Sequence, residues 1–124
     1  MSNNRRYDIY DRAFNFAVKV ANFLETLPKR TVFIEYSRQL IKSSGSIGAN
    51  ISEADGALTK KDFVNKMGIA RRETKESKHW LTLIEAVGSF KDENTKKELC
   101  WLIRESTEIL LILSAIITNT RKGN

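Results

Sequence analysis

The segment from residue 39 to residue 81 constrains the fold of this chain most strongly, because two helical patterns meet there at a single turn. Apolar and small residues recur at steps of three or four over residues 40–54, and a second series with the same spacing covers residues 63–88. Thr59 can cap the second helix, and Asp62 follows three residues later, as in an acidic variant of the capping box. This pattern predicts two long helices joined by a short, capped turn.

The rest of the chain adds two more helical patterns. Apolar residues recur at steps of three, four or seven from Ile9 to Leu27, and Pro28 ends this helix because the residue before a proline is pushed out of the helical region. A last pattern runs from Leu99 to Ile117, and no segment alternates with the period of two that a strand needs. The sequence therefore predicts an all-α fold, an antiparallel up-and-down four-helix bundle. We expect one domain over residues 1–124, with helices at roughly 8–27, 31–55, 60–88 and 93–120.

The cysteine and histidine content limits the chemistry of the chain. One Cys and one His cannot build a tetrahedral zinc site, and the second Glu-x-x-His of a di-iron bundle is missing, so we expect no metal and no cofactor. Cys100 lies between Leu99 and Trp101 in an apolar pattern, which predicts a small buried side chain in a reducing compartment. The N-terminus shows no apolar signal segment, and no apolar run approaches the ~20 residues of a membrane span. A cytoplasmic protein is expected.

Three of the predicted helices carry more apolar surface than one core stripe needs. A monomer of this length has no second core to cover the excess, and exposed apolar patches usually mark an interface. We therefore expect self-association, the alternative being a monomer with a wide core. The candidate interface residues are Phe14, Val18, Ile34, Ile41, Ile69, Trp80, Leu83 and Val87.

A polar stripe follows the apolar stripe of the second predicted helix with the same spacing. It is either a solvated flank or a half-buried seam of hydrogen bonds against the third helix, where Glu73 and Glu76 offer partners. Such a seam would fix the register of the two helices, because an unpaired buried polar group costs about 1–3 kcal/mol. One carboxylate without an activated nucleophile is a weak basis for catalysis. The stripe consists of Gln39, Ser43, Ser46, Asn50 and Glu53.

The positive charge of the chain, +6 with an isoelectric point near 9.6, is concentrated on the third predicted helix. Six of its seven basic residues fall within or at the edge of one arc when successive residues are rotated by about 100°. The arc is either a ridge that contacts phosphates or an ordinary solvated face, and repetition of the ridge in an oligomer would strengthen its field. The candidate nucleic-acid-binding residues of this basic arc are Lys60, Lys61, Arg71, Arg72, Lys75 and Lys78.

The only histidine, His79, follows Arg72 by seven residues, so the two side chains share one helical face. This spacing resembles the R-x4-6-H motif of HEPN ribonucleases, which are also helical bundles. In that family the pair acts on the 2′-hydroxyl and the scissile phosphate, usually across a dimer interface. A two-residue match is a weak signal on a helix rich in Arg and Lys.

A longer pattern resembles the family of proteins encoded in 23S rRNA intervening sequences and, more distantly, the accessory variability protein of diversity-generating retroelements. The pattern covers nearly the whole chain, from Tyr7-Asp8-Ile9 and Arg12-Ala13 onward, and departs at Ala54, where many members have Gly. The matching residues of the central segment are Gln39-Leu40, Lys42-Ser43, Ser46 to Ile51, Glu53, Lys61-Asp62-Phe63, Lys66-Met67, Ile69-Ala70, Glu73-Thr74 and those up to Trp80-Leu81.

This resemblance implies a bacterial four-helix bundle assembled as a ring-shaped homopentamer, with no established catalytic activity. The retroelement relatives use the basic surface of the ring to engage nucleic acid and a reverse transcriptase. We therefore expect a non-enzymatic homo-oligomer whose basic arc binds RNA or DNA without strong sequence preference. The alternatives are a HEPN-like ribonuclease that uses Arg72 and His79, and a structural or adaptor oligomer with a protein partner.

Overall fold

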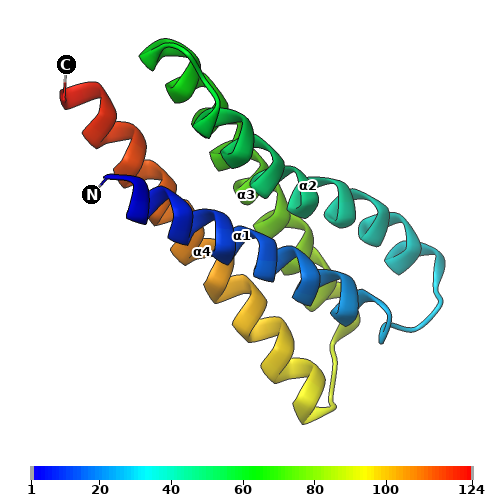
Figure 1. Ribbon diagram of the computed structural model, residues 1–124. Coiled ribbons are helices and arrows are strands. Elements are labelled where there is room, and N and C mark those ends of the chain that lie inside the picture. Colours follow the sequence, from blue (N-terminus) through cyan, green and yellow to red (C-terminus); the bar gives the residue numbers. More distant parts are fainter. Residues whose placement is uncertain (1, 124) are drawn as a thin grey trace.

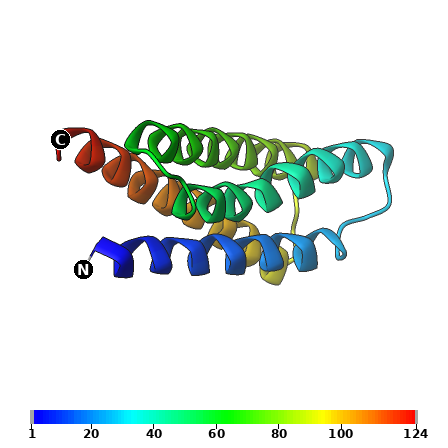
Figure 2. The ribbon, with the colours of Figure 1, turned by 45° about the horizontal axis from the view of Figure 1, so that its top comes forward.

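The described residues fold into four long helices that run alternately up and down (Figure 1). The structure, a computed structural model, describes residues 2–123, with side chains from residue 9 onward. Both ends of the chain lie at the same end of the bundle (Figures 1 and 2). The helices are α1 (Ser2–Leu24), α2 (Thr31–Asp55), α3 (Lys60–Gly88) and α4 (Glu93–Lys122).

Each helix packs on two neighbours, so that α1 touches α2 and α4 while α3 lies between α2 and α4. In Figure 2, α2 lies between α1 and α3. The predicted apolar stripes supply the core: Phe16 of α1, Ile47 of α2, Leu81 of α3 and Ile109 of α4 are fully buried. The all-α prediction of four helices is confirmed, because helical spacing alone decides which side of each helix faces its neighbours.

Capping side chains mark the starts of α3 and α4. The Thr59 hydroxyl accepts a hydrogen bond from the Asp62 N–H at 3.0 Å, and Asp92 accepts one from the Thr95 N–H at 2.9 Å. α2 and α3 have the predicted bounds, whereas α1 ends at Leu24, about one turn before the predicted end. The chain tightens into turns at this point, with Leu24 accepting from the Leu27 N–H at 3.3 Å. The side chain of Leu27 remains in the core although it has left the helix.

Two core predictions need correction. Cys100 is exposed, whereas the sequence predicted a buried side chain. Its neighbours Leu99 and Leu102 occupy the core positions of α4, and one residue of helix turns Cys100 by about 100° away from Leu99. Conversely, Phe23 is fully buried but was absent from the predicted stripe. It lies one turn after Val20 and completes the stripe near the end of α1.

No helix in the described part of the chain combines the length and the apolar character needed to span a bilayer.

Candidate nucleic-acid interface

The basic arc lies on one side of α3, at the start of the helix and again between residues 71 and 78. Lys60, Lys61, Arg72 and Lys75 are exposed, and Lys78 is half-buried. The acidic residues in the first two-thirds of α3 fall outside this arc on a helical wheel. The cations of the arc fall in two groups, Lys60 and Lys61 at the start of α3 and four residues between 71 and 78, and Glu76 lies at the edge of the second group.

Arg71 anchors the basic arc to the neighbouring helix. Its Nε donates a hydrogen bond to the Ser114 Oγ on α4 at 2.7 Å, which holds the guanidinium beside the α3–α4 junction. The Arg71 side chain is half-buried, so its stem packs while its charged end stays near the surface. The two terminal nitrogens remain as donors beyond this bond.

Next to the arc, α3 carries an open hollow of about 410 Å³ that combines cations, an acid and aromatic rings. Trp80 forms one wall, and its ring packs on Tyr36 of α2 with centroids 5.6 Å apart. His79 stands edge-on to Trp80, with centroids 5.0 Å apart and an angle of 70° between the rings. The residues that line the hollow are Arg72, Lys75, Glu76, His79 and Trp80.

Trp80 also holds a polar group without a partner. Its indole Nε1 is buried and forms no hydrogen bond among the described residues. A buried indole N–H usually finds an acceptor, and an unsatisfied donor costs about 1–3 kcal/mol. The packing on Tyr36 and the core offsets this cost, so the Trp80 ring is a fixed wall of the hollow.

The structure reduces the predicted polar seam to one contact between helices. The buried hydroxyl oxygens of Ser43 and Ser77 lie 2.8 Å apart between α2 and α3. Ser46 and Asn50 instead donate hydrogen bonds to the carbonyls of Lys42 and Ser46 within α2. Gln39 and Glu53 are exposed. Two hydroxyls, rather than the predicted glutamates Glu73 and Glu76, connect the two helices here because their short side chains fit the close helix contact.

Glu73 lies beside this contact in a half-buried position. Burial raises the pKa of Glu73, and the nearby carboxylate of Glu76 raises it further, while Arg72 and Lys42 lower it. The net rise means that the folded protein disfavours the charged form of this carboxyl.

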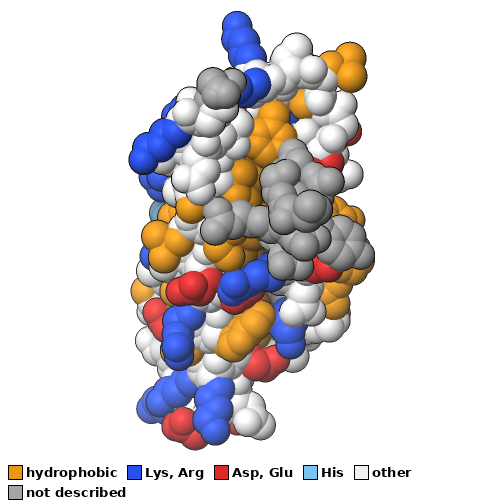
Figure 3. Space-filling model, turned by 60° about the vertical axis from the view of Figure 1, so that its left-hand side comes forward, with side chains coloured by type: hydrophobic (Ala, Val, Ile, Leu, Met, Phe, Trp, Pro, Cys, Tyr) orange, Lys and Arg blue, Asp and Glu red, His pale blue; other side chains and the backbone are white. Residues whose placement is uncertain are grey.

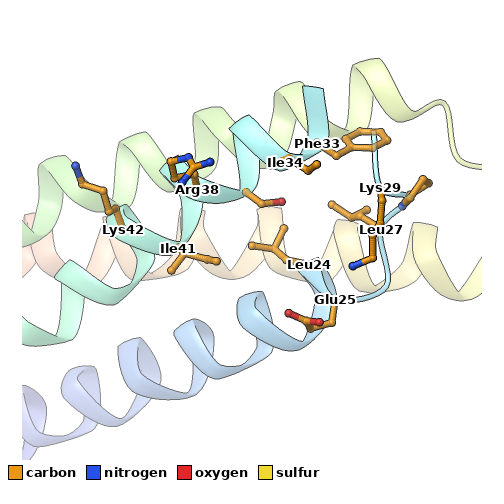
Figure 4. Close-up of a pocket in the computed structure, with 11 residues that line it drawn as sticks. Leu24, Glu25, Leu27, Lys29, Phe33, Ile34, Arg38, Ile41 and Lys42 are labelled. Atoms are coloured by element: carbon orange, nitrogen blue, oxygen red, sulfur yellow. The ribbon is translucent and has the colours of Figure 1, made fainter. Parts of the chain in front are cut away.

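A second surface, between α1 and α2, is apolar. Phe14, Val18, Ile34 and Ile41 are between 43% and 59% exposed. Beside them lies a groove of about 510 Å³, in which Leu24 and Ile41 point towards one another across the gap between the helices (Figure 4). On the face drawn in Figure 3, hydrophobic side chains likewise reach the surface between charged ones. The charged residues at the edge of the groove are Glu25, Lys29, Arg38 and Lys42.

The other four candidate interface residues, on α3, are less exposed. Trp80 and Val87 pack against the core, and Ile69 and Leu83 are half-buried. Among the candidate interface residues, the exposed ones therefore lie on α1 and α2. Other large exposed apolar side chains among the described residues are Leu58 in the turn before α3 and Trp101 and Leu111 on α4.

The model of the 23S rRNA-intervening sequence protein family matches residues 5–114 of this chain. The chain belongs to this family. A similar solved structure is the crystal structure of a protein with unknown function from the S23 ribosomal protein family of Bacteroides thetaiotaomicron. It shares 32% sequence identity over 92% of this chain and 98% of that chain, with a TM-score of 0.78. No curated protein matches the chain.

Sequence patterns missed two parts of the surface of this member of the 23S rRNA-intervening sequence protein family. Glu76 was considered only as a partner for the polar seam but lines the hollow, and Tyr36 supports the hollow from α2. The spacing of Arg72, Glu76 and His79, at four and three residues, could have placed all three on one face. The support from Tyr36 depends on how α2 lies against α3, and no spacing within one helix reports that.

Among the described residues, no group of three His, Cys, Asp or Glu side chains is placed to hold a metal ion.

Proposed function

We propose that this protein is a non-enzymatic, homo-oligomeric helical bundle that binds RNA or DNA through its basic arc, without strong sequence preference. The observation that supports this function is the group of cations on one side of α3 between residues 71 and 78, with Arg71 held in place by Ser114. Binding of this kind draws its free energy mainly from the release of counterions from the phosphates. The affinity should therefore fall steeply as the salt concentration rises.

The surface proposed for self-association is the apolar side between α1 and α2. Two of its four exposed side chains, Ile34 and Ile41, line the groove, and a second copy seated in the groove would cover them. A contact between two different surfaces of neighbouring copies closes into a ring when the rotation allows it. The resemblance to the family of proteins encoded in 23S rRNA intervening sequences implies a pentamer. A ring would repeat the basic arc and raise the avidity for a long polyanion.

The nucleic-acid claim is tested by charge reversal on the basic arc. The triple variant Arg71→Glu, Lys75→Glu and Lys78→Glu should lose retention of labelled RNA and DNA at low salt, with helical content unchanged by circular dichroism. A matched control reverses Lys91, Lys96 and Lys97, which are exposed near the α3–α4 turn. Equal retention by the two triple variants would refute the claim.

Assembly is tested by light scattering at micromolar concentration. Ile41→Lys places a charge in the groove and should shift the protein from oligomer to monomer. Leu111→Lys changes a side chain of similar exposure on α4 and should leave the oligomer intact. A wild-type monomer at this concentration would contradict the ring.

A second candidate function, ribonuclease activity, is favoured by one observation. Arg72 and His79 line the same hollow, so both side chains can reach one phosphodiester group. Cleavage of RNA that is lost on His79→Ala would support a HEPN-like enzyme. Intact RNA after long incubation would eliminate it, and absence of any binding would leave a structural or adaptor role with a protein partner.

A further inference from the structure

The hollow on α3 differs from the rest of the basic arc because it offers three kinds of contact within one turn or two of helix. Arg72 and Lys75 supply positive charge, Glu76 supplies a hydrogen-bond acceptor, and His79 supplies an exposed aromatic ring. A ligand that uses all of them needs an anionic group, a hydroxyl donor and a flat ring. A ribonucleotide unit carries these three groups together.

The anionic group belongs beside Arg72 and Lys75. Both side chains are exposed, and they lie three residues apart on one face of α3. A guanidinium binds two phosphate oxygens at once, while an ammonium group adds a compact charge. Lys78 extends the same positive field along the helix towards the next phosphate of a strand.

The flat ring belongs on His79. The edge-on contact with Trp80 leaves at least one face of the imidazole free of that ring, and the His79 side chain is exposed. Trp80 is itself held by Tyr36 of α2, so the support behind His79 is rigid. A base can stack on the free face only when it is not already stacked and paired inside a duplex.

Glu76 explains why this site favours a particular sugar. A carboxylate repels phosphate, so its presence among cations weakens purely electrostatic binding. It can, however, accept a hydrogen bond from a ribose hydroxyl, the group that distinguishes RNA from DNA. Glu76 therefore penalises a strand that lacks the hydroxyl and rewards one that has it.

We propose that the hollow binds one nucleotide unit of single-stranded RNA, with its phosphate on Arg72 and Lys75, its 2′-hydroxyl on Glu76 and its base stacked on His79. This proposal rests on the proposed function and adds the class of nucleic acid. It makes the basic arc a general phosphate-binding surface and the hollow the part that discriminates between strands.

The test compares the full-length protein with three probes of matched sequence, namely single-stranded RNA, single-stranded DNA and double-stranded RNA, at one fixed salt concentration. Single-stranded RNA should bind at least about fivefold more tightly than either of the others. His79→Ala should weaken its binding by a similar factor, and His79→Phe, which keeps an aromatic face, should restore most of the loss. In a Trp101→Phe background, the fluorescence of Trp80 should respond to single-stranded RNA and not to the duplex.

The role of Glu76 is tested by a ratio of affinities. Glu76→Ala removes an acidic charge and should bring the RNA and single-stranded DNA affinities together. Glu85→Ala removes the same charge at an exposed position of α3 outside the hollow, and should leave the ratio unchanged. Equal affinity for all three probes, unaffected by His79→Ala, would overturn the proposal. In that case, loss of binding in the triple variant of the basic arc would still support nucleic-acid binding by the arc. The proposed function would then stand although the proposal for the hollow had failed.

Discussion

The hydroxyl groups of Ser43 and Ser77 lie 2.8 Å apart, fully enclosed between α2 and α3, and form a hydrogen bond across the largest helix contact of the bundle. Each hydroxyl carries one proton, so one serine donates across the contact and the other donates to a carbonyl of its own helix. The carbonyls within reach are that of Leu40 for Ser43, at 3.3 Å, and that of Glu73 for Ser77, at 2.9 Å. Both buried hydroxyls therefore have a hydrogen-bond partner, and the pair contributes to the register of the two helices.

The first prediction concerns the coupling between these two serines. Ser43→Ala and Ser77→Ala should each have a small effect alone, because alanine improves helix propensity by about 0.5 kcal/mol while the hydrogen bond is lost. In a double-mutant cycle the propensity terms cancel, and a favourable coupling of about 0.5–1 kcal/mol should remain. Urea unfolding of the four proteins measures this coupling. Strict additivity would show that the hydroxyls contribute nothing to each other.

The second prediction concerns the end of α3. Ser89 holds the left-handed conformation with φ 45°, although Gly88 precedes it. A Cβ at Gly88 would overlap the ring of Phe90, which stacks on Phe33 with centroids 5.9 Å apart. Gly88→Ala should therefore destabilise the fold by about 1–3 kcal/mol through overpacking.

A substitution at the next residue, Ser89, should stabilise the fold instead. Ser89→Gly removes the strain of a left-handed residue with a side chain, and should stabilise the fold by up to about 1 kcal/mol. Thermal unfolding of both single variants gives the comparison. If Ser89→Gly were the more damaging of the two, the assignment of their roles would be reversed.

These glycine and serine positions show what spacing can and cannot predict. Helical phase located the buried sides of all four helices, because burial of Ile47 or Leu81 depends only on its angle around the helix axis. The turn after α3 was also placed correctly. The sequence could not show that Gly88 is small to admit Phe90, since that contact depends on how the turn folds back.

The candidate site was predictable to a similar extent. The basic arc follows from the spacing within α3, and so does the shared face of Arg72 and His79. The role of Trp80 as a wall of the hollow does not follow from this spacing, because the ring is held by Tyr36 of another helix. The prediction that Cys100 is buried was wrong for a different reason. It relied on the apolar neighbours in the sequence, whereas the position of Cys100 around the axis of α4 faces solvent.

The third prediction is a pH dependence from Glu73. The pKa of Glu73 is raised in the folded protein above the ordinary value of 4.5, mainly by burial. The unfolded chain therefore loses this proton first, and the contribution of Glu73 to stability is lost as the pH rises through the folded pKa. Below pH 4.5 the Glu73 carboxyl is protonated in both the folded and the unfolded state, so burying it no longer lowers the free energy of unfolding.

Replacing the Glu73 carboxyl with an amide should reveal the free energy that burial of its charged form costs the folded protein. Glu73→Gln should raise the free energy of unfolding modestly at pH 7, and the gain should disappear below pH 4.5. Glutamate and glutamine have similar helix propensities, so the comparison reports the charge. Urea unfolding at the two pH values provides the measurement. A loss of stability at pH 7 would mean that attraction to Arg72 and Lys42 outweighs burial.

The fourth prediction uses Cys100 to test the phase of α4 in the native state. The exposed thiol should react with a thiol reagent under native conditions at a rate close to that in the unfolded chain. As a matched control, the variant Leu99→Cys with Cys100→Ser moves the thiol by one residue into the core, where Leu99 is 1% exposed. That thiol should react only as fast as the protein opens. The opposite result would be slow reaction of Cys100, even after dilution to monomer, together with rapid reaction of the control. That result would show that α4 is rotated from the position described.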